Sequence, residues 1–250
     1  MNNRNFNDNE NLTDTSGQPD NTGFNVDEIL LKNVCKSYGG VRVYDNFNAR
    51  IKKHAITAIL GESGSGKTTL LNIIAGLTDY SGEVTGVTKP VSFVFQRDRL
   101  VKTLTAEQNV RLVAKDADVK AAFNAVGLSG CEHMYPKELS AGMARRVAFL
   151  RAFLFNSDTV LMDEPFVNLD VATKYRLIDE VKSVHAKTGK TLVVVTHDVK
   201  EAAELAENVA VLSRGKIVYE RAGLNVCDKE KTEAELLGVM LGLGNVSDNN

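Results

Sequence analysis

Short runs in which apolar and polar residues alternate dominate the start of the ordered part of the chain. Alternation begins at residues 29–31 and continues through 41–51, which predicts antiparallel strands with one buried face. Residues 54–60 are mostly apolar, as is typical of a strand buried on both faces, and residues 91–95 give a second strand signal. The pattern therefore predicts a sheet-rich first third.

Strands and helices then alternate to the end of the chain. Helices are predicted at 69–76, 105–128, 141–155 and 173–187, and strands at 159–162, 191–195, 209–212 and 216–219. The predicted apolar contacts of the second helix are Val110, Val113, Val119, Phe123 and Val126. Such alternation predicts an α/β fold with a mostly parallel sheet that helices cover on both faces.

Composition adds few constraints. The 250 residues are 43% hydrophobic and 25% charged with a net charge of −2, so no overall basic field favours nucleic acid. We expect no membrane-spanning stretch and no secretory signal. Residues 1–25 are polar and rich in asparagine, which predicts a disordered tail. Cys35, Cys131 and Cys227 show neither metal-ligand nor disulfide spacing, which fits a reducing cytosol.

A glycine-rich segment between the strand at 54–60 and the helix at 69–76 satisfies the phosphate-loop pattern. Its backbone N–H groups can surround a phosphate, its lysine can reach the outer phosphates, and its threonine can bind Mg²⁺. A chance glycine–serine turn is the weaker interpretation. The predicted ATP-binding residues are Gly61, Glu62, Ser63, Gly64, Ser65, Gly66, Lys67, Thr68 and Thr69.

Two adjacent carboxylates follow the apolar strand at 159–162. Ligands of open α/β sheets bind at the carboxyl ends of the strands, so these side chains should face the phosphate loop. Asp163 would support a Mg²⁺ ion between the terminal phosphates, and Glu164 would polarise an attacking water. The chain is thus predicted to bind and hydrolyse a nucleoside triphosphate.

From about residue 28 to 220, the chain resembles the ATP-binding subunits of ABC transporters. Further motifs of that family occur in the family's order: Tyr38 at the adenine-stacking aromatic, Gln96 at the Q-loop, residues 139–143 at the signature segment, residues 168–170 at the D-loop and His197 at the switch histidine. The resemblance implies a P-loop NTPase core with an N-terminal antiparallel β subdomain, a small α-helical subdomain at about 97–155 and a C-terminal extension at 223–250.

The resemblance also assigns roles to these residues. Tyr38 would stack on adenine, although it could be a core aromatic at a strand end. Gln96 would bind Mg²⁺ or the attacking water, and His197 would contact the γ-phosphate and Glu164, although either could be merely structural. The other histidines, His54, His133 and His185, are expected at the surface.

The signature segment departs from the family's Leu-Ser-Gly-Gly-Gln. Ser140 and Gly142 are retained, whereas Ala141 replaces a glycine and Met143 replaces the glutamine. In the family this segment closes over ATP bound to the opposite subunit. We expect ATP binding to survive these changes, whereas they leave open the rate of ATP hydrolysis.

The implied assembly is a peripheral complex on the cytoplasmic face of the cell membrane. It would contain a second ATPase subunit, integral membrane permease subunits and a solute-binding protein, with ATP and Mg²⁺ as cofactors and no direct nucleic-acid contact. Residues 95–110 look similar to bacterial importers of the nitrate, sulfonate and taurine branch. The alternatives are a soluble ABC-type ATPase that acts on ribosomes or DNA, and a nucleotide-binding regulator with weak turnover.

Overall fold

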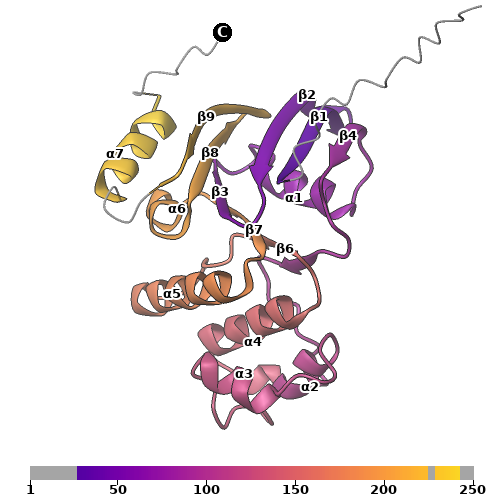
Figure 1. The fold of residues 1–250 in the computed structure, drawn as a ribbon, viewed down its shortest axis with the longest axis vertical. Coiled ribbons are helices and arrows are strands. Elements are labelled where there is room, and N and C mark those ends of the chain that lie inside the picture. Colours follow the sequence, from indigo (N-terminus) through magenta and orange to yellow (C-terminus); the bar gives the residue numbers. More distant parts are fainter. Residues whose placement is uncertain (1–26, 225–228, 243–250) are drawn as a thin grey trace, which may run out of the picture.

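The computed structural model describes residues 27–224 and 229–242, which form two sheets and a set of flanking helices (Figure 1). The predicted tail at 1–25 and Cys227 lie outside these residues. Within them, no helix combines the length and the apolar character that a membrane span requires.

The larger sheet has six strands in the order β5-β6-β7-β3-β8-β9. Its first five strands run parallel, and only β9 pairs antiparallel, with β8. The strands are β3 (Ile56–Leu60), β5 (Ser92–Val94), β6 (Thr159–Asp163), β7 (Thr191–Thr196), β8 (Asn208–Ser213) and β9 (Lys216–Ala222). The predicted mostly parallel sheet is confirmed.

The smaller sheet is antiparallel, with β1 (Glu28–Tyr38) between β2 (Val41–Lys52) and β4 (Ser81–Thr85). The short strand β4 was not predicted. Its burial pattern contains no fully buried residue, so the two-residue alternation that marks a half-buried strand is weak there.

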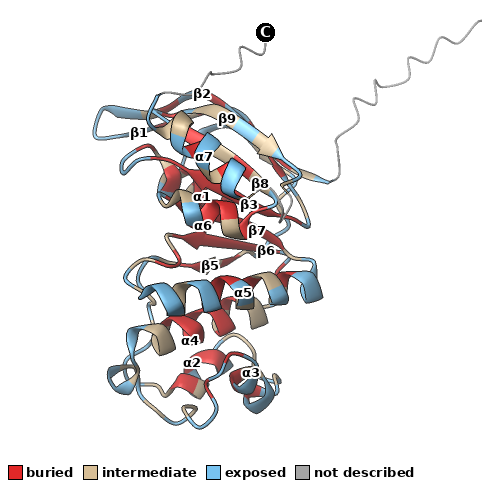
Figure 2. Cartoon of the chain, turned by 90° about the vertical axis from the view of Figure 1, so that its left-hand side faces the viewer, coloured by how far each residue is buried: buried red, intermediate tan, exposed pale blue. Residues whose placement is uncertain are grey.

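Two apolar layers cover the two faces of the larger sheet. Leu161 and Val193 pack with helix α1 (Lys67–Ala75) and the antiparallel sheet on one face. Met162 and Val194 pack with helix α5 (Val171–Thr188) on the other. The central strands β3, β6 and β7 are accordingly buried along their whole length, whereas α5 exposes its outer side (Figure 2). The phosphate loop follows the last residue of β3, so it lies at the carboxyl edge of a sheet that is packed on both faces.

The helical subdomain lies at the opposite end of the molecule from the antiparallel sheet (Figure 1). It contains α2 (Ala106–Arg111), α3 (Val119–Ala125), a 3₁₀ turn η1 (Pro136–Glu138) and α4 (Ala141–Leu154). The single helix predicted at 105–128 is therefore wrong. The apolar spacing is continuous, but the chain leaves the helix after Arg111 and Asp118 caps a new one by accepting from the Ala121 N–H.

The C-terminal helix α7 (Lys229–Met240) packs beside helix α6 (Val199–Leu205) and β8. Leu236 is fully buried there, whereas Leu237 and Leu241 are exposed. Helix α6 was not predicted. Its seven residues are too few to show clear periodicity, and it begins because Asp198 accepts from the N–H groups of Lys200 and Glu201.

Candidate nucleotide-binding site

The phosphate loop joins the buried strand β3 to helix α1. Gly61 has no room for a side chain, because a Cβ atom there would lie 2.3 Å from the carbonyl oxygen of Leu212. Gly66, the residue that caps α1, has a φ of 110°, a conformation that only glycine adopts readily. The loop therefore approaches its neighbours more closely than a loop with side chains could.

Lys67 is buried at the first position of α1, with 7% of its surface exposed. Its ammonium donates to the carbonyl oxygens of Gly61 (2.7 Å) and Glu62 (2.8 Å), and lies 3.9 Å from Glu164 Oε1. Burial lowers the pKa of Lys67, while Glu164 and Asp163 act in the opposite direction. The two carboxylates thus favour the charged form of Lys67, which lies where a polyphosphate would enter the loop.

Thr68 and Asp163 bring two kinds of oxygen ligand together. The Thr68 hydroxyl lies 3.1 Å from each carboxylate oxygen of Asp163, at the end of β6. Burial raises the pKa of Asp163, and the Thr68 hydrogen bond opposes that shift. Hydroxyl and carboxylate oxygens suit Mg²⁺, and Gln96 lines the same cleft. These residues fit a magnesium ion, which would neutralise phosphate charge when bound.

Glu164 and His197 form a polar pair at the ends of β6 and β7. Nδ1 of His197 lies 2.8 Å from Glu164 Oε2, and His197 is largely exposed. Glu164 has a φ of 46°, and its N–H donates to the carbonyl of Val195 at 3.0 Å. A positive φ is uncommon outside glycine, so the surrounding structure must hold this backbone. The result is a carboxylate that faces the phosphate loop.

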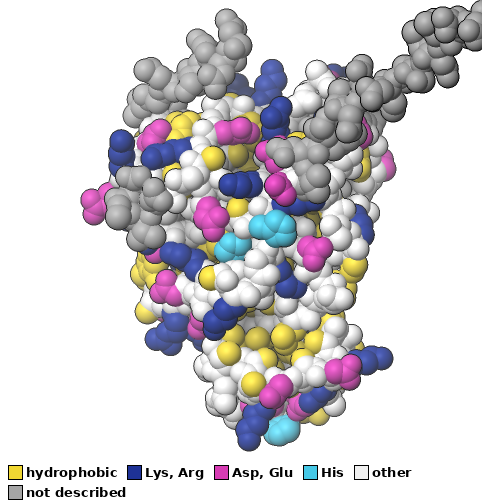
Figure 3. All heavy atoms as spheres, in the orientation of Figure 1, with side chains coloured by type: hydrophobic (Ala, Val, Ile, Leu, Met, Phe, Trp, Pro, Cys, Tyr) yellow, Lys and Arg dark blue, Asp and Glu magenta, His cyan; other side chains and the backbone are white. Residues whose placement is uncertain are grey.

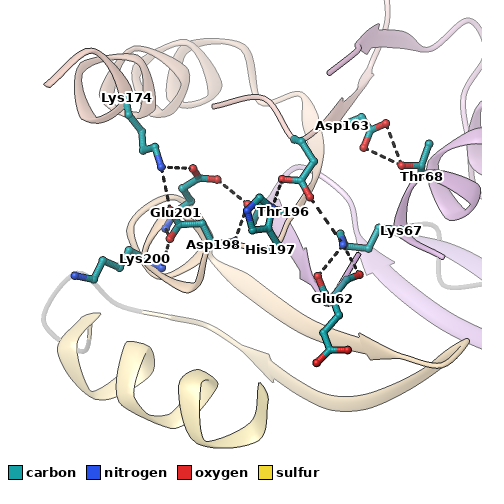
Figure 4. A network of polar contacts seen from close by, with 12 residues as sticks. Glu62, Lys67, Thr68, Asp163, Lys174, Thr196, His197, Asp198, Lys200 and Glu201 are labelled. Carbon is teal, nitrogen blue, oxygen red and sulfur yellow. Dashed lines mark hydrogen bonds and ion pairs between the residues drawn. The ribbon is translucent and has the colours of Figure 1, made fainter. Parts of the chain in front are cut away.

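A second polar network supports the segment that carries His197 (Figure 4). Lys174 on α5 contacts Asp198 at 2.9 Å and Glu201 at 2.6 Å. Glu201 accepts from the Thr196 hydroxyl at 2.6 Å. Burial raises the pKa of Glu201, although Lys174 opposes it. These contacts tie both neighbours of the histidine to helices behind it.

One cleft of about 640 Å³ collects most of the predicted site residues. Its lining includes Glu62, Ser63, Gly64, Gly66, Lys67, Thr68, Thr69, Gln96, Asp163, Glu164 and His197. Val43 and Met240 also line it, and neither was predicted. The predicted residues Gly61, Ser65, Tyr38, Ser140 and Gly142 are absent from this lining; the first two lie in the loop itself, and the other three lie elsewhere on the chain.

Known proteins share this sequence and fold. Residues 44–167 match the ABC transporter family. The aliphatic sulfonates import ATP-binding protein SsuB of Bacillus cereus is 39% identical over 204 residues, covering 75% of this chain and 81% of that protein. This chain belongs to the ATP-binding proteins of ABC transporters. It therefore binds ATP and is an ATPase of that family.

Two further ABC proteins extend the comparison. The sulfate/thiosulfate import ATP-binding protein of Rhizobium meliloti is 36% identical over 214 residues, covering 76% of this chain and 58% of that protein. The dimeric cassette MJ0796 in a post-hydrolysis state, bound to ADP and Pi, aligns with a TM-score of 0.68 at 31% identity. The alignment covers 78% of this chain and 98% of that cassette.

In this ABC protein the signature segment opens helix α4, away from the cleft. Ser140 caps α4 by accepting from the Met143 N–H at 3.3 Å. Ala141 is the first residue of the helix and does not have a positive φ, so an alanine is accommodated without backbone strain. The Met143 side chain packs on the core of the helical subdomain. The substitutions therefore leave the capped helix start intact.

Tyr38 lies at the end of β1 and is 46% exposed. Nζ of Lys36 lies 4.5 Å from the centroid of its ring, and its hydroxyl lies 3.4 Å from Thr78 Oγ1. The interpretation as a core aromatic is thus wrong, because nearly half of the side chain reaches the surface. Stacking on adenine stays a prediction.

His185 differs from its expected surface position. It is 8% exposed, and its ring nitrogens lie 2.9 Å from the carbonyl oxygen of Lys190 and 3.2 Å from Glu207 Oε1. His185 continues the buried face of α5 at four-residue intervals from Leu177 and Val181, and this spacing is the sequence signal for its burial.

Tyr44 supports the phosphate loop from the antiparallel sheet, and sequence reasoning missed it. The side chain is fully buried, burial raises its pKa, and its hydroxyl donates to the carbonyl of Gly66 at 2.9 Å. We expect Tyr44→Phe to lower the free energy of unfolding by about 1 kcal/mol, the usual net value of one hydrogen bond, and to weaken ATP binding several-fold. Urea unfolding and titration with a fluorescent ATP analogue measure the two effects.

Tyr219→Phe is the matched control for this prediction. Its hydroxyl donates to Glu235 at 2.8 Å on α7, so it loses one hydrogen bond away from the loop. ATP affinity should be unchanged in the control. Equal affinities for the Tyr44 and Tyr219 variants would show that the hydroxyl of Tyr44 does not support the loop.

Proposed function

We propose that this chain is the energy-coupling subunit of an importer, in which ATP binding and hydrolysis move a solute through separate integral membrane subunits. One observation carries the ATP hydrolysis in this proposal: the cleft brings together a phosphate loop, a threonine–carboxylate pair for Mg²⁺ and a Glu164–His197 pair, all at one sheet edge. The similar proteins of Bacillus cereus and Rhizobium meliloti are named as import proteins, which supports the proposed direction of transport.

In the proposed reaction, Lys67 and the loop would hold the phosphates, and Thr68, Asp163 and Gln96 would hold Mg²⁺. Glu164 would accept a proton from water as the water oxygen bonds to the γ-phosphorus, while the bond from that phosphorus to the β–γ bridging oxygen breaks and ADP leaves. His197 would orient the carboxylate and contact the γ-phosphate. Because the hydrogen-bond donors and the base are already in place before the reaction, little reorganisation is needed to reach the transition state. Such preorganisation is usually the largest contribution to the catalysis of phosphoryl transfer.

Two parts of the surface are proposed to meet partners. Ser140 and Gly142 would close over ATP bound to a second ATPase subunit, so that two copies form two composite sites. The segment 97–105 would contact a permease subunit; Val101 in this segment is 40% exposed. Hydrophobic side chains also gather on the helical subdomain, in the lower part of Figure 3. The complex would lie on the cytoplasmic face of the membrane and receive solute from a solute-binding protein.

The substrate is proposed to be an oxyanion of sulfur, with aliphatic sulfonates first, because two related import proteins are named for such compounds. Selection would lie in the other subunits, so this part of the proposal is independent of the cleft.

The test is purification of tagged Glu164→Gln chain, with ATP and the native tail, from detergent-solubilised membranes of its own host. We expect stoichiometric integral membrane subunits and, after reconstitution of the wild-type complex in liposomes, ATP-dependent uptake of a labelled sulfonate. The Lys67→Ala variant should abolish uptake. Recovery of ribosomes in place of membrane subunits would overturn the transport proposal, and uptake of other solutes only would overturn the substrate class.

A further inference from the structure

Arg145 is an almost fully buried arginine in helix α4, with 3% of its surface exposed. Nη1 donates to the carbonyl of Phe95 (2.7 Å) and to Asp98 Oδ1 (2.8 Å). Nη2 donates to the carbonyls of Gln96 (2.9 Å) and Glu164 (3.3 Å). A single guanidinium therefore joins the segment that carries Gln96 to the backbone of the proposed catalytic carboxylate.

The contacts of Arg145 lie where two neighbouring strands stop pairing. Strands β5 and β6 are parallel, and their register ends at Val94 opposite Met162. Beyond that pair, the carbonyls of Phe95, Gln96 and Glu164 accept from the guanidinium. Arginine presents five N–H donors in one rigid plane, and these contacts use two on each terminal nitrogen. The ammonium of a lysine has no such planar fork, so it cannot reproduce the same geometry.

Arg145 also holds the unusual backbone of Glu164. The positive φ of 46° places Glu164 in a conformation that a non-glycine residue keeps only when its surroundings fix it. Its N–H donates to Val195 on β7, and its carbonyl accepts from Arg145. The carboxylate that contacts His197 is thus aimed by one hydrogen bond on each side of its own Cα atom.

Helix α4 links these contacts to the signature segment. Ser140 caps the helix, and Arg145 follows in its second turn. Because a helix turn is rigid, a displacement of the cap moves the guanidinium with it. The same helix therefore carries the residue proposed to face a partner's ATP and the residue that touches both sides of the chain's own cleft.

We propose that Arg145 is a positioning residue that sets the separation of Gln96 and Glu164 and makes hydrolysis depend on the placement of the signature helix. It acts through the backbone of these residues and does not touch the nucleotide. The inference rests on the proposed roles of Gln96 and Glu164, and it adds a residue that the phosphate-loop and strand-end motifs do not contain.

The decisive comparison is Arg145→Gln with Arg146→Gln in the full chain. Arg146 is the matched control, since it lies next in α4, is 11% exposed at its side chain and pairs with one carboxylate, Glu180, at 3.3 Å. The quantities measured are kcat, the Kd of a fluorescent ATP analogue, the Mg²⁺ concentration that gives half-maximal hydrolysis, and the melting temperature.

For Arg145→Gln we expect kcat to fall by about 10–100-fold, the loss that a misplacement near 1 Å produces. The Kd of the analogue should stay within about twofold, because no phosphate contact is lost. The half-maximal Mg²⁺ concentration should rise several-fold as Gln96 shifts. Arg146→Gln should lower the melting temperature, because it removes the ion pair with Glu180, and it should leave the Mg²⁺ requirement unchanged. Arg145→Lys should follow Arg145→Gln, and it decides the matter if the glutamine variant does not fold.

A kcat within about twofold of wild type in the folded Arg145 variants, or an equal loss in Arg146→Gln, would overturn the inference. So would a fall in kcat with an unchanged Mg²⁺ requirement. The transport proposal is judged separately by the recovered membrane subunits, so the failure of either is recognisable.

Discussion

Replacing Glu164 by glutamine should preserve ATP binding and lower turnover by roughly 10²–10⁴-fold, the loss expected for a missing general base. Glutamine has nearly the same shape and can still contact His197, which lies 2.8 Å from Oε2. It cannot accept a proton from water at neutral pH. Lys67, 3.9 Å from Oε1, keeps its contacts with the loop. With hydrolysis blocked, the ATP-bound dimer should accumulate.

Two measurements check this expectation: single-turnover hydrolysis, and the elution volume of the protein with ATP and Mg²⁺. Glu207→Gln is the control, because Glu207 also pairs with a histidine, His185, at 3.2 Å. Its N–H donates to the carbonyl of Ile56 at the start of β3, at the opposite end of that strand from the phosphate loop. The control should hydrolyse ATP at the wild-type rate. Near-wild-type turnover of the Glu164 variant would remove Glu164 from the proposed catalytic role.

Much of the cleft was predictable because local sequence decides it. A strand, a glycine-rich loop and a helix in succession define the phosphate loop, and the end of an apolar strand places Asp163 beside it. Parallel strands end at the same edge of a sheet. The contact between Thr68 and Asp163, which are far apart in the chain, can therefore be predicted from the strand order alone.

The supporting contacts were not predictable, because each depends on an approach that no local pattern records. Tyr44 meets Gly66 only once the antiparallel sheet packs on α1, and Arg145 meets Glu164 only once α4 lies under two strand ends. A buried arginine looks like any surface arginine in a helix sequence. Arg145 and Arg146 are both buried in the fold, although arginine is mostly an exposed residue, so their sequence gives no signal of this burial.

The helix start at the signature segment shows how a motif can change while its structure persists. A glycine is needed where φ is positive or space is absent, and Ala141 meets neither condition. Gly142 is different, because a Cβ there would lie 3.0 Å from the Thr173 side chain. At Gly142, therefore, the packing of α4 against α5 leaves little room for a side chain, and this is the glycine that the chain retains.

Replacing Lys67 by alanine should weaken ATP binding by roughly 10–100-fold, which corresponds to the 1.5–3 kcal/mol of a hydrogen bond to a charged group. The ammonium is buried and donates to the Gly61 and Glu62 carbonyls, so its loss would loosen the loop and remove the proposed phosphate contact. The substitution also removes the positive charge that interacts with Asp163 and Glu164. These two carboxylates would then repel the phosphates of an incoming ATP.

Titration with a fluorescent ATP analogue, with and without Mg²⁺, measures the loss. Lys190→Ala is the matched control, because the Lys190 ammonium likewise donates to two backbone carbonyls, those of Phe155 (2.9 Å) and Ser157 (2.7 Å), and burial likewise lowers its pKa. The control should lose stability and keep its ATP affinity, since those carbonyls lie outside the cleft. If both lysine variants bind ATP as the wild type does, Lys67 does not hold phosphate, and the affinity must come from the backbone of the loop alone.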